Sequence, residues 1–303
     1  MSQEKKTNTL ILVCCHNKQN ILETKNIKPI LVGAEISKLD IYPYKDNIGD
    51  DNISIRNPNY NELTAMYWAW KNLSADITNI GFFHYRRYLS LRNTIAPAKF
   101  LTNARILMEY VFGYSQNLIE KLSQEFDIIL PLKQKPTLIN KGVAKNLNMG
   151  EHFVRAHSQK VVDEVRNIIL EKMPEYKTAL EVSLNEKSCY FKNIFIMKKE
   201  YFNNYMTFMF NVLFEFEARN KNNEIASQAR INGFIAERLI NIYVNKLIAE
   251  NKNIKLTEFK ILRRFHINIL NSAYCNKQFS KLKNRLNLNY IKYAISIITG
   301  KGK

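Results

Sequence analysis

Short apolar runs alternate with amphipathic stretches along most of the chain. The apolar runs predict strands over residues 9–15, 29–32, 79–83, 126–130 and 190–197, with a last strand over 254–259. Apolar positions at helical spacing predict helices from Asn59 or Asn61 through Leu73, over 116–124, after a Ser158 cap, after Lys198, and over 226–247. This order predicts an α/β domain with a mixed, mostly parallel sheet flanked by helices.

The chain shows no Gly/Ser-rich or Pro-rich linker before residue 255. We therefore expect one domain over residues 1–254 and a separate tail over 255–303. The segment 131–150 is rich in Lys, Asn and Gly and is expected to form a loop. In sheets of this kind ligands bind beyond the carboxyl ends of strands, so the polar segments that follow strands are the places to look for chemistry.

Positive charge is concentrated in the tail. The formal net charge is +18, and residues 255–303 contain eleven Lys or Arg and one acidic residue, Glu258. Such a surplus indicates a polyanionic partner. Because the basic residues alternate with Ile, Leu, Phe and Tyr, the expected structure is an amphipathic helical tail on an anionic membrane surface. Packing of the tail on the domain is the alternative, and nucleic acid is not expected because no recognised module is evident.

The short apolar runs favour a cytoplasmic protein. No run approaches the ~20 residues that span a bilayer, and residues 10–15 are too short for a secretory signal. The four cysteines have no CxxC spacing, which indicates buried thiols instead of a disulfide framework or a zinc site. Cys14, Cys15 and His16 are not expected to form a thiol nucleophile, because adjacent strand residues point to opposite faces.

The segment His84-Tyr85-Arg86-Arg87-Tyr88 follows an apolar strand directly. Two guanidinium groups at that position can grip a diphosphate bidentately, and the tyrosines can stack on a base or a sugar. The structural alternative is that one arginine pairs with an internal carboxylate while the tyrosines pack. Both interpretations remain open from the residues alone.

Asp46, Asp50 and Asp51 lie in a glycine-containing loop. They can orient sugar hydroxyls or hold a divalent ion, or they can simply cap turns. The chain contains no Asp-x-Asp pair of the kind that holds a metal ion on a nucleotide diphosphate.

Two other groups of residues can carry acid–base chemistry. Arg230, Glu237 and Asn241 form a polar stripe on the helix expected over 226–247, where Glu237 can act as a general base or pair with an arginine, Arg230 or Arg238. Glu151, His152 and His157 can contact an acceptor or act as a base. The five histidines show no metal-binding spacing such as HExxH.

Seven blocks of residues, in order, resemble a known family. They are CHNK (15–18), VGA (32–34), IGDDNIS (48–54), YNELTAMYWAWKN (60–72), GFFHYRRY (81–88), NIFIMKKE (193–200) and GFIAERLINIY (233–243). Together they resemble the DUF4422 family of bacterial capsule and exopolysaccharide proteins, whose characterised members are galactofuranosyltransferases. The resemblance covers roughly residues 9–250 and leaves the tail outside.

The resemblance implies a GT-A-like fold. It also implies transfer of a galactofuranosyl residue, with inversion, from UDP-galactofuranose to a lipid-linked glycan in capsule, exopolysaccharide or O-antigen assembly. The slot that holds a metal-binding Asp-x-Asp in GT-A enzymes here contains His84-Tyr85-Arg86, so we expect guanidinium groups to replace a metal ion, with no tightly bound cofactor. The alternatives are another donor such as UDP-galactopyranose, or a non-catalytic protein that binds glycans or nucleic acid. The enzyme would lie at the inner face of the cell membrane.

This interpretation gives each candidate residue a role. The expected general base is Glu237, with Glu151 and Asp163 as second and third candidates. The residues expected to contact the acceptor are His152, His157 and Arg230. Residues of the strand ends, the glycine-containing loop and the helix start are expected to bind the donor: His16, Lys18, Gly33, Asp50, Asp51, Asn52, Tyr60, Glu62, Thr64, His84, Tyr85, Arg86, Arg87 and Asn193.

Overall fold

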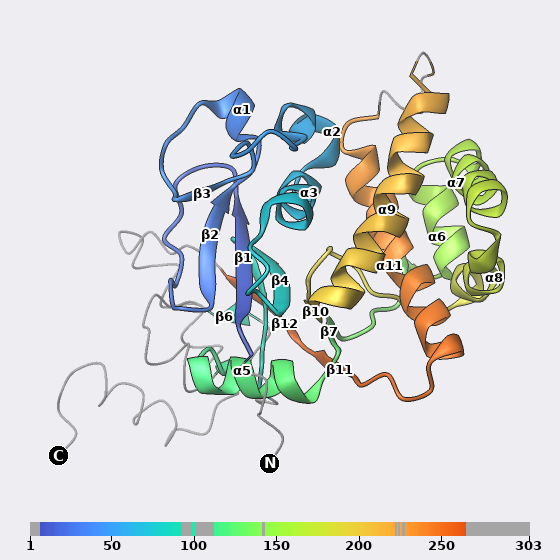
Figure 1. The fold of residues 1–303 in the computed structure, drawn as a ribbon. Helices are drawn as coiled ribbons and strands as arrows, with labels where there is room; N and C mark the ends of the chain where they lie inside the picture. The colour runs from blue at the N-terminus through green and yellow to red at the C-terminus, as the bar shows by residue number, and fades with distance from the viewer. Residues whose placement is uncertain are drawn as a thin grey trace.

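A ten-stranded sheet with helices on both faces forms the centre of the computed structural model (Figure 1). The structure describes residues 7–92, 99–100, 112–140, 143–221, 223, 225 and 228–264. The strand order is β11-β7-β10-β4-β1-β2-β3. Off this path, β5 pairs with the end of β4, β12 pairs with β5, and β6 pairs with β12. The strands of this sheet are β1 (Thr9–Cys15), β2 (Ile27–Leu31), β3 (Tyr44–Lys45), β4 (Asn79–His84), β5 (Arg87–Leu89), β6 (Lys99–Phe100), β7 (Ile128–Pro131), β10 (Phe195–Lys198), β11 (Leu256–Phe259) and β12 (Ile261–Arg264).

Most strands of the main path run in the same direction, as expected from the sequence. β1 is parallel to β2 and β4, β2 is parallel to β3, and β7 is parallel to β11. β10 is antiparallel to both of its neighbours, β4 and β7, so these two strands share one direction. The carboxyl ends of β1, β4, β7 and β11 therefore meet at one edge of the sheet, together with the residues that lead into β10.

Helices cover the two faces of the sheet through two separate apolar cores. The larger core joins the sheet to the long helices that lie on one side in Figure 1, and the smaller core lies between the other face and α5. Cys14 belongs to the larger core and Cys15 to the smaller one, which confirms that their thiols point to opposite faces. The helices are α1 (Ala34–Ser37), α2 (Asn57–Tyr60), α3 (Leu63–Asn72), α5 (Gln116–Glu125), α6 (Met149–Ala156), α7 (Gln159–Lys172), α8 (Lys177–Asn185), α9 (Lys199–Arg219) and α11 (Ile231–Glu250).

The expected boundary at residue 254 falls inside the domain. β11 pairs in parallel with β7, and β12 pairs with β5 and β6, so both strands are part of the main sheet. The sheet therefore continues past residue 254, because backbone groups of β11 and β12 form ladder hydrogen bonds with other strands of the sheet. The remaining part of the expected tail, residues 265–303, lies outside the described residues.

Asn61 divides the helix that the sequence predicts up to Leu73. The chain instead forms the short α2 and then α3, and Asn61 between them has φ 49° and ψ −125°. Neither Asn59 nor Asn61 caps α3, because the residue before its first turn is Glu62. Asn61 is held in place from two sides: Asn57 Nδ2 donates to its carbonyl oxygen, and Arg230 Nε donates to its side-chain oxygen.

Two other expectations need correction. Residues 131–150 are not a simple loop, because β8 (Thr137–Asn140) and β9 (Val143–Asn146) form an antiparallel hairpin and α6 begins at Met149. The helix expected from residue 226 begins at Ile231, because Arg230 has φ 66°, which ends the helical backbone on that side. Among the described helices, none combines the length and the hydropathy that a membrane span requires.

Candidate active site

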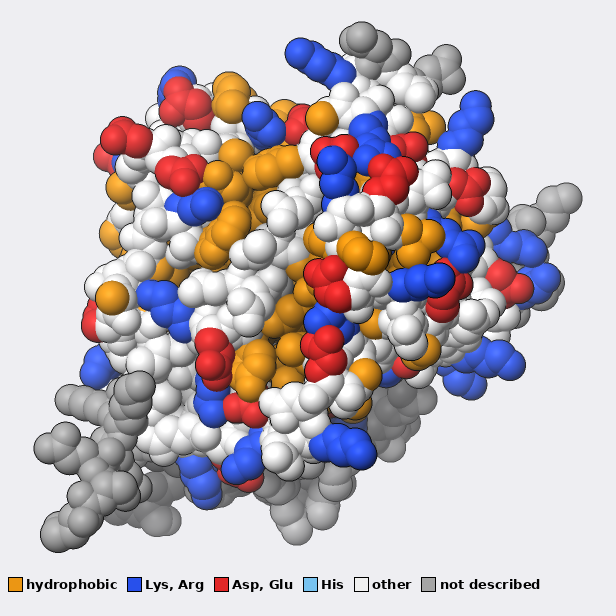
Figure 2. Space-filling view, turned by 45° about the vertical axis from the view of Figure 1, so that its right-hand side comes forward, with side chains coloured by type: hydrophobic (Ala, Val, Ile, Leu, Met, Phe, Trp, Pro, Cys, Tyr) orange, Lys and Arg blue, Asp and Glu red, His pale blue; other side chains and the backbone are white. Residues whose placement is uncertain are grey.

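Several cations lie where the carboxyl ends of the parallel strands meet. A pocket of about 420 Å³ opens there. The residues that line it follow β4, β7 and β11 or precede β10, and they are Arg87, Leu132, Lys133, Gln134, Lys192, Lys260, Ile261 and Arg263. Five of these eight residues are Lys or Arg and none is acidic. On the face shown in Figure 2, in contrast, acidic and basic side chains are interspersed.

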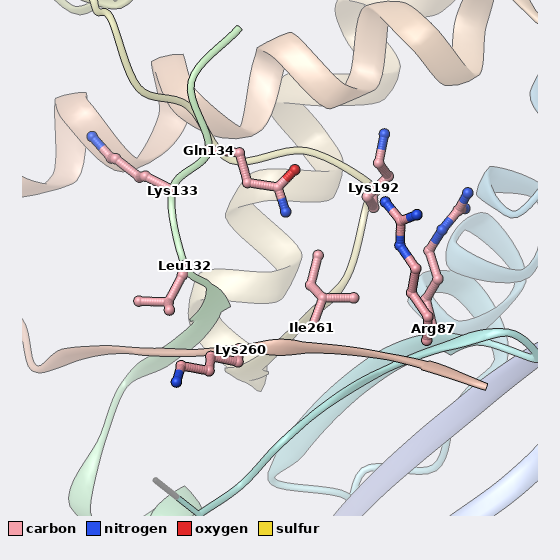
Figure 3. Close-up of a pocket in the computed structure, with 8 residues that line it drawn as sticks. Arg87, Leu132, Lys133, Gln134, Lys192, Lys260 and Ile261 are labelled. Atoms are coloured by element: carbon pink, nitrogen blue, oxygen red, sulfur yellow. The ribbon is translucent and has the colours of Figure 1, made fainter. Parts of the chain in front are cut away.

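The cations do not all point into the pocket. Arg87 and Lys192 bring their charged ends to the same side of it, and the Gln134 amide is directed toward them from the other side (Figure 3). Lys133 and Lys260 extend away from this group (Figure 3). The ammonium group of Lys133 is moreover paired with Glu186 at 2.9 Å. The free positive charge of the pocket therefore gathers at its Arg87 end.

Arg87 is placed by a tight turn at the end of β4. His84 and Arg87 are cross-strand partners, so Tyr85 and Arg86 form the turn between β4 and β5. The pKa of Arg87 is lowered, mainly by burial and then by the charge of Arg86. Arg86 itself is exposed, with its guanidinium carbon 4.9 Å from the centre of the Tyr85 ring. No described carboxylate forms an ion pair with either arginine, so the alternative of an internal ion pair is not observed.

A hydrogen-bonded group next to Arg87 positions a carboxylate. His84 Nε2 donates to the carbonyl oxygen of Lys192 at 2.7 Å. Asn193 Nδ2 donates to Glu62 Oε1 at 2.8 Å and to the carbonyl oxygen of Gly233 at 3.1 Å. Glu62 Oε1 also lies 3.9 Å from His84 Nε2. These contacts tie the end of β4, the start of α3 and the first turn of α11 into one wall.

The backbone at Lys192 and Asn193 corrects the strand expected over 190–197. Lys192 has φ 84° and Asn193 has φ 47°, and β10 begins only at Phe195. Non-glycine residues adopt positive φ at an energetic cost of order 1–3 kcal/mol, which the surrounding contacts must offset. Here the reversal turns the Lys192 carbonyl toward His84 and the Asn193 amide toward Glu62. The side-chain oxygen of Asn193 is buried and has no hydrogen-bond partner.

Glu237 is a second carboxylate near Arg87. It lies on α11, and its side chain is 14% exposed. One oxygen is 3.4 Å from Nη1 of the buried Arg238, so the expected pairing with an arginine is present. Both Glu237 and Glu62 act electrostatically on Arg87 by favouring its charged form. The site thus combines a cationic end with two partly buried carboxylates.

The three residues expected to contact an acceptor lie along α6 and the start of α11. The guanidinium of Arg238 donates to His152 Nδ1 at 3.1 Å. The His157 ring lies 4.9 Å from the Phe234 ring, and the guanidinium carbon of Arg230 lies 5.9 Å from the same ring. These residues therefore share the α11 helix as a common support with Glu237.

His152 is held as a neutral ring. Its pKa is lowered to about 4, first by burial and then by the positive charge of Arg238. Because a guanidinium can only donate, Nδ1 must accept and the neutral ring carries its proton on Nε2. His152 can therefore donate a hydrogen bond to a ligand through Nε2 and does not supply positive charge near neutral pH.

This neutral state predicts a dependence of stability on pH. A histidine in the unfolded chain titrates near pH ~6.5, so between about pH 6.5 and 4 the unfolded state binds this proton more readily than the folded state. Stability should therefore fall as the pH is lowered through this window. In His152→Gln we expect the loss of melting temperature between pH 7 and pH 5 to be smaller than in the wild type, as followed by circular dichroism. An equal loss in both proteins would contradict this assignment.

Several residues expected to bind the donor have structural roles. Asp46 is fully buried and accepts hydrogen bonds from the amides of Gly33 (2.7 Å) and Ala34 (3.0 Å) and from the hydroxyls of Ser54 and Thr64 (2.5 Å each). Gly33, at φ 66°, therefore has its amide occupied, and a Cβ there would lie 2.8 Å from Asn57 Oδ1. Thr64 is likewise buried in this group.

Tyr60 and the loop 50–52 do not line this pocket. Tyr60 is fully buried and donates to Glu217 at 2.9 Å. Asp51 accepts from Tyr67 at 2.7 Å, and Asn52 closes its own loop by donating to the carbonyl oxygen of Gly49. Asp50 is exposed in the same loop.

Two of the three candidate bases are held by local helix contacts. Glu151 forms a capping box with Asn148 at the start of α6, in which each side chain bonds the other residue's backbone amide. Asp163 accepts from Gln159 Nε2 at 2.8 Å on the exposed side of α7. Glu237 differs from both because it is largely buried and acts on the charge of Arg87, as does Glu62.

At the ends of β1 and β4 the structure does bring predicted residues together. His16 and Lys18 are exposed just after β1. The His16 ring meets the Tyr85 ring edge-on, with centroids 5.1 Å apart. Arg87 is the lining residue that the sequence predicted for the site, and sequence reasoning missed the other seven: Leu132, Lys133, Gln134, Lys192, Lys260, Ile261 and Arg263. The basic composition after residue 255 was the available signal, but it indicated a membrane and not this pocket.

No metal-binding group is present among the described residues: none of their His, Cys, Asp and Glu side chains gather in threes or more in a way that could hold an ion.

Comparison with known proteins shows the family and the fold of this chain. A family model described as "Domain of unknown function (DUF4422)" matches residues 10–251. Among solved structures, the apo structure of the bifunctional glycosyltransferase WbbM is similar, with a TM-score of 0.77 and 30% sequence identity. The similarity covers 86% of this chain and 46% of the WbbM chain, so this chain spans about half the length of that protein. No protein of curated function matches the sequence.

Proposed function

Because this chain belongs to the DUF4422 family, and its fold is that of a solved glycosyltransferase, we propose that it transfers a sugar from a nucleotide-diphosphate donor. The donor in this proposal is UDP-galactofuranose, and the acceptor is a lipid-linked glycan of a surface polysaccharide. The observation that carries the proposal is the pocket at the carboxyl ends of the strands, which presents cations and no carboxylate. Such a lining suits a diphosphate leaving group.

The proposed reaction is a direct displacement with inversion. An acceptor hydroxyl oxygen bonds to the anomeric carbon while the bond from that carbon to the diphosphate oxygen breaks. Arg87 and Lys192 stabilise the negative charge that develops on the departing diphosphate. Glu237 takes the proton of the acceptor hydroxyl, and Glu62 is the second carboxylate within reach of the same charge.

The two sides of the site suggest where each substrate lies. His16, Lys18 and Tyr85, at the ends of β1 and β4, support the proposal that the nucleoside binds there. His152, His157 and Arg230 support an acceptor on the α6 and α11 side. We further propose a cytoplasmic protein at the inner face of the membrane, where a lipid-linked acceptor would be available.

The sharpest test is an assay of donor choice in the presence and absence of a chelator. Purified protein is incubated with a panel of UDP-sugars and a synthetic lipid-linked acceptor, and the product is identified by mass and NMR. We expect transfer of galactofuranose with inversion, at a rate that EDTA leaves unchanged. Transfer of galactopyranose alone would replace the donor, and a rate lost to EDTA and restored by Mn²⁺ would contradict the role given to the cations.

A non-catalytic binding protein would give a different result. It would bind a glycan or a nucleic acid and leave every UDP-sugar intact, without hydrolysis or transfer. Tight duplex binding with a steep dependence on salt would indicate the nucleic-acid alternative.

A further inference from the structure

Strand β12 places a second arginine directly across from Arg87. Arg263 and Arg87 are cross-strand partners in the antiparallel β12–β5 pair, and both line the pocket. The Cβ atoms of directly opposed residues on neighbouring strands lie roughly 5 Å apart, and like charges in that position destabilise the pair. The β12–β5 contact thus holds two positive charges together at the end of the sheet.

Within the described part of the chain no ion pair relieves this repulsion, although the charges of Glu237 and Glu62 favour the charged form of Arg87. No described carboxylate forms an ion pair with Arg263 or with Arg87. A further cation of the pocket, Lys192, brings its charged end to the Arg87 side (Figure 3). The charge of Arg263 contributes, after burial and Arg86, to lowering the pKa of Arg87. An anion bound between these side chains would be attracted by each of these positive charges and would offset their mutual repulsion.

We propose that Arg263 is a donor-binding residue, which grips the diphosphate together with Arg87, and that the bound diphosphate in turn stabilises the pairing of β12 with β5. The inference rests on the proposed function, because it takes the donor's diphosphate as the ligand. A diphosphate has two phosphoryl groups, and each can accept the paired N–H donors of one guanidinium. Arg263 is exposed, so a ligand can reach it from solvent.

The coupling follows from mass action. A ligand that binds only when β12 is paired stabilises that pairing in proportion to its concentration. Without ligand, the opposed arginines weaken the strand pair, and with ligand they are bridged. The donor is therefore expected to stabilise the pairing of β12 with β5.

The test measures binding and stability together in the full chain. We expect Arg263→Ala to weaken UDP binding by at least about tenfold in calorimetry. In the absence of ligand its melting temperature should equal or exceed that of the wild type, because the repulsion is gone. UDP should slow hydrogen exchange of the β12 amides in the wild type and not in Arg263→Ala. Lys255→Ala removes an exposed cation of the same segment and should behave as the wild type.

Three ligands separate the possible sources of the diphosphate. UDP and inorganic pyrophosphate should both bind more weakly to Arg263→Ala. If binding of farnesyl diphosphate depends on Arg263 and binding of UDP does not, the residue belongs to a lipid diphosphate site and the proposal is overturned. The proposal is also overturned if Arg263→Ala binds UDP as the wild type does. It is overturned likewise if the ligand-free variant melts at a lower temperature than the wild type while UDP raises the melting temperature of both proteins equally. If the wild type binds pyrophosphate through Arg263 but no nucleotide, the anion site stands and the proposed function fails.

Discussion

Replacing Arg87 with alanine is expected to lower kcat/KM by roughly 10²–10³-fold, the usual cost of removing one preorganised donor to developing negative charge. Arg87 lines the pocket, is half-buried, and has no described carboxylate as a partner. Its charge is therefore available to a ligand and is only weakly screened by solvent. Steady-state kinetics with UDP-sugar as the varied substrate measure the effect. Arg87→Lys should recover only part of the activity, because lysine keeps the charge but loses the planar fork.

Arg86→Ala is the matched control. Arg86 is adjacent in sequence and equally charged, but it is exposed and rests on the Tyr85 ring instead of lining the pocket. We expect this variant to lose less than about tenfold in kcat/KM, because exposed charges contribute little. Equal losses of kcat/KM in Arg86→Ala and Arg87→Ala would show that the two arginines contribute only non-specific positive charge. An Arg87→Ala enzyme with normal kinetics would remove the diphosphate from this pocket.

Glu237→Gln is expected to lower kcat by roughly 10²–10⁴-fold while UDP binding stays near that of the wild type. The substitution keeps the size of the side chain and its ability to contact Arg238, but it removes the basic oxygen that accepts the acceptor proton. Single-turnover measurements, together with UDP calorimetry, separate the chemical step from binding.

Glu151→Gln provides the control for this substitution. Glutamine can serve in the capping box that holds Glu151, so α6 should remain intact and turnover should be unchanged. Loss of turnover in Glu151→Gln with normal turnover in Glu237→Gln would reverse the two roles. Loss in Glu62→Gln alone would instead move the base to α3, where Asn193 orients the Glu62 carboxylate.

The order of strands and helices could be predicted because it depends on local patterns. The run TLILVCC forms β1 over its full predicted length, and Ser158 caps α7 by accepting from the Val161 amide. The basic–aromatic segment after β4 was also correctly placed at the carboxyl edge of the sheet. Each of these features requires information only from residues close together in the sequence.

The local sequence pattern gave wrong predictions where a residue contacts a partner that is distant in the sequence. Lys192 and Asn193 lie in a run of strand-forming residues, yet their backbone reverses to meet His84 and Glu62, which are more than a hundred residues away. Asp46 looked like a ligand-binding loop residue, but it is buried among donors from three segments of the chain. Local propensity contains no information about such partners.

The sequence by itself determined the α/β class, the alternation of elements and the presence of cations after β4, since periodicity and strand ends are encoded locally. Only the tertiary structure decided which cations share a pocket. Arg263 stands beside Arg87 because β12 pairs with β5, although the two residues are far apart along the chain. The same folding places Arg87 but not Arg86 in the pocket lining, and it leaves Glu237 largely buried beside Arg238 while Glu151 caps α6. Burial and strand register depend on the whole sheet and not on neighbouring residues.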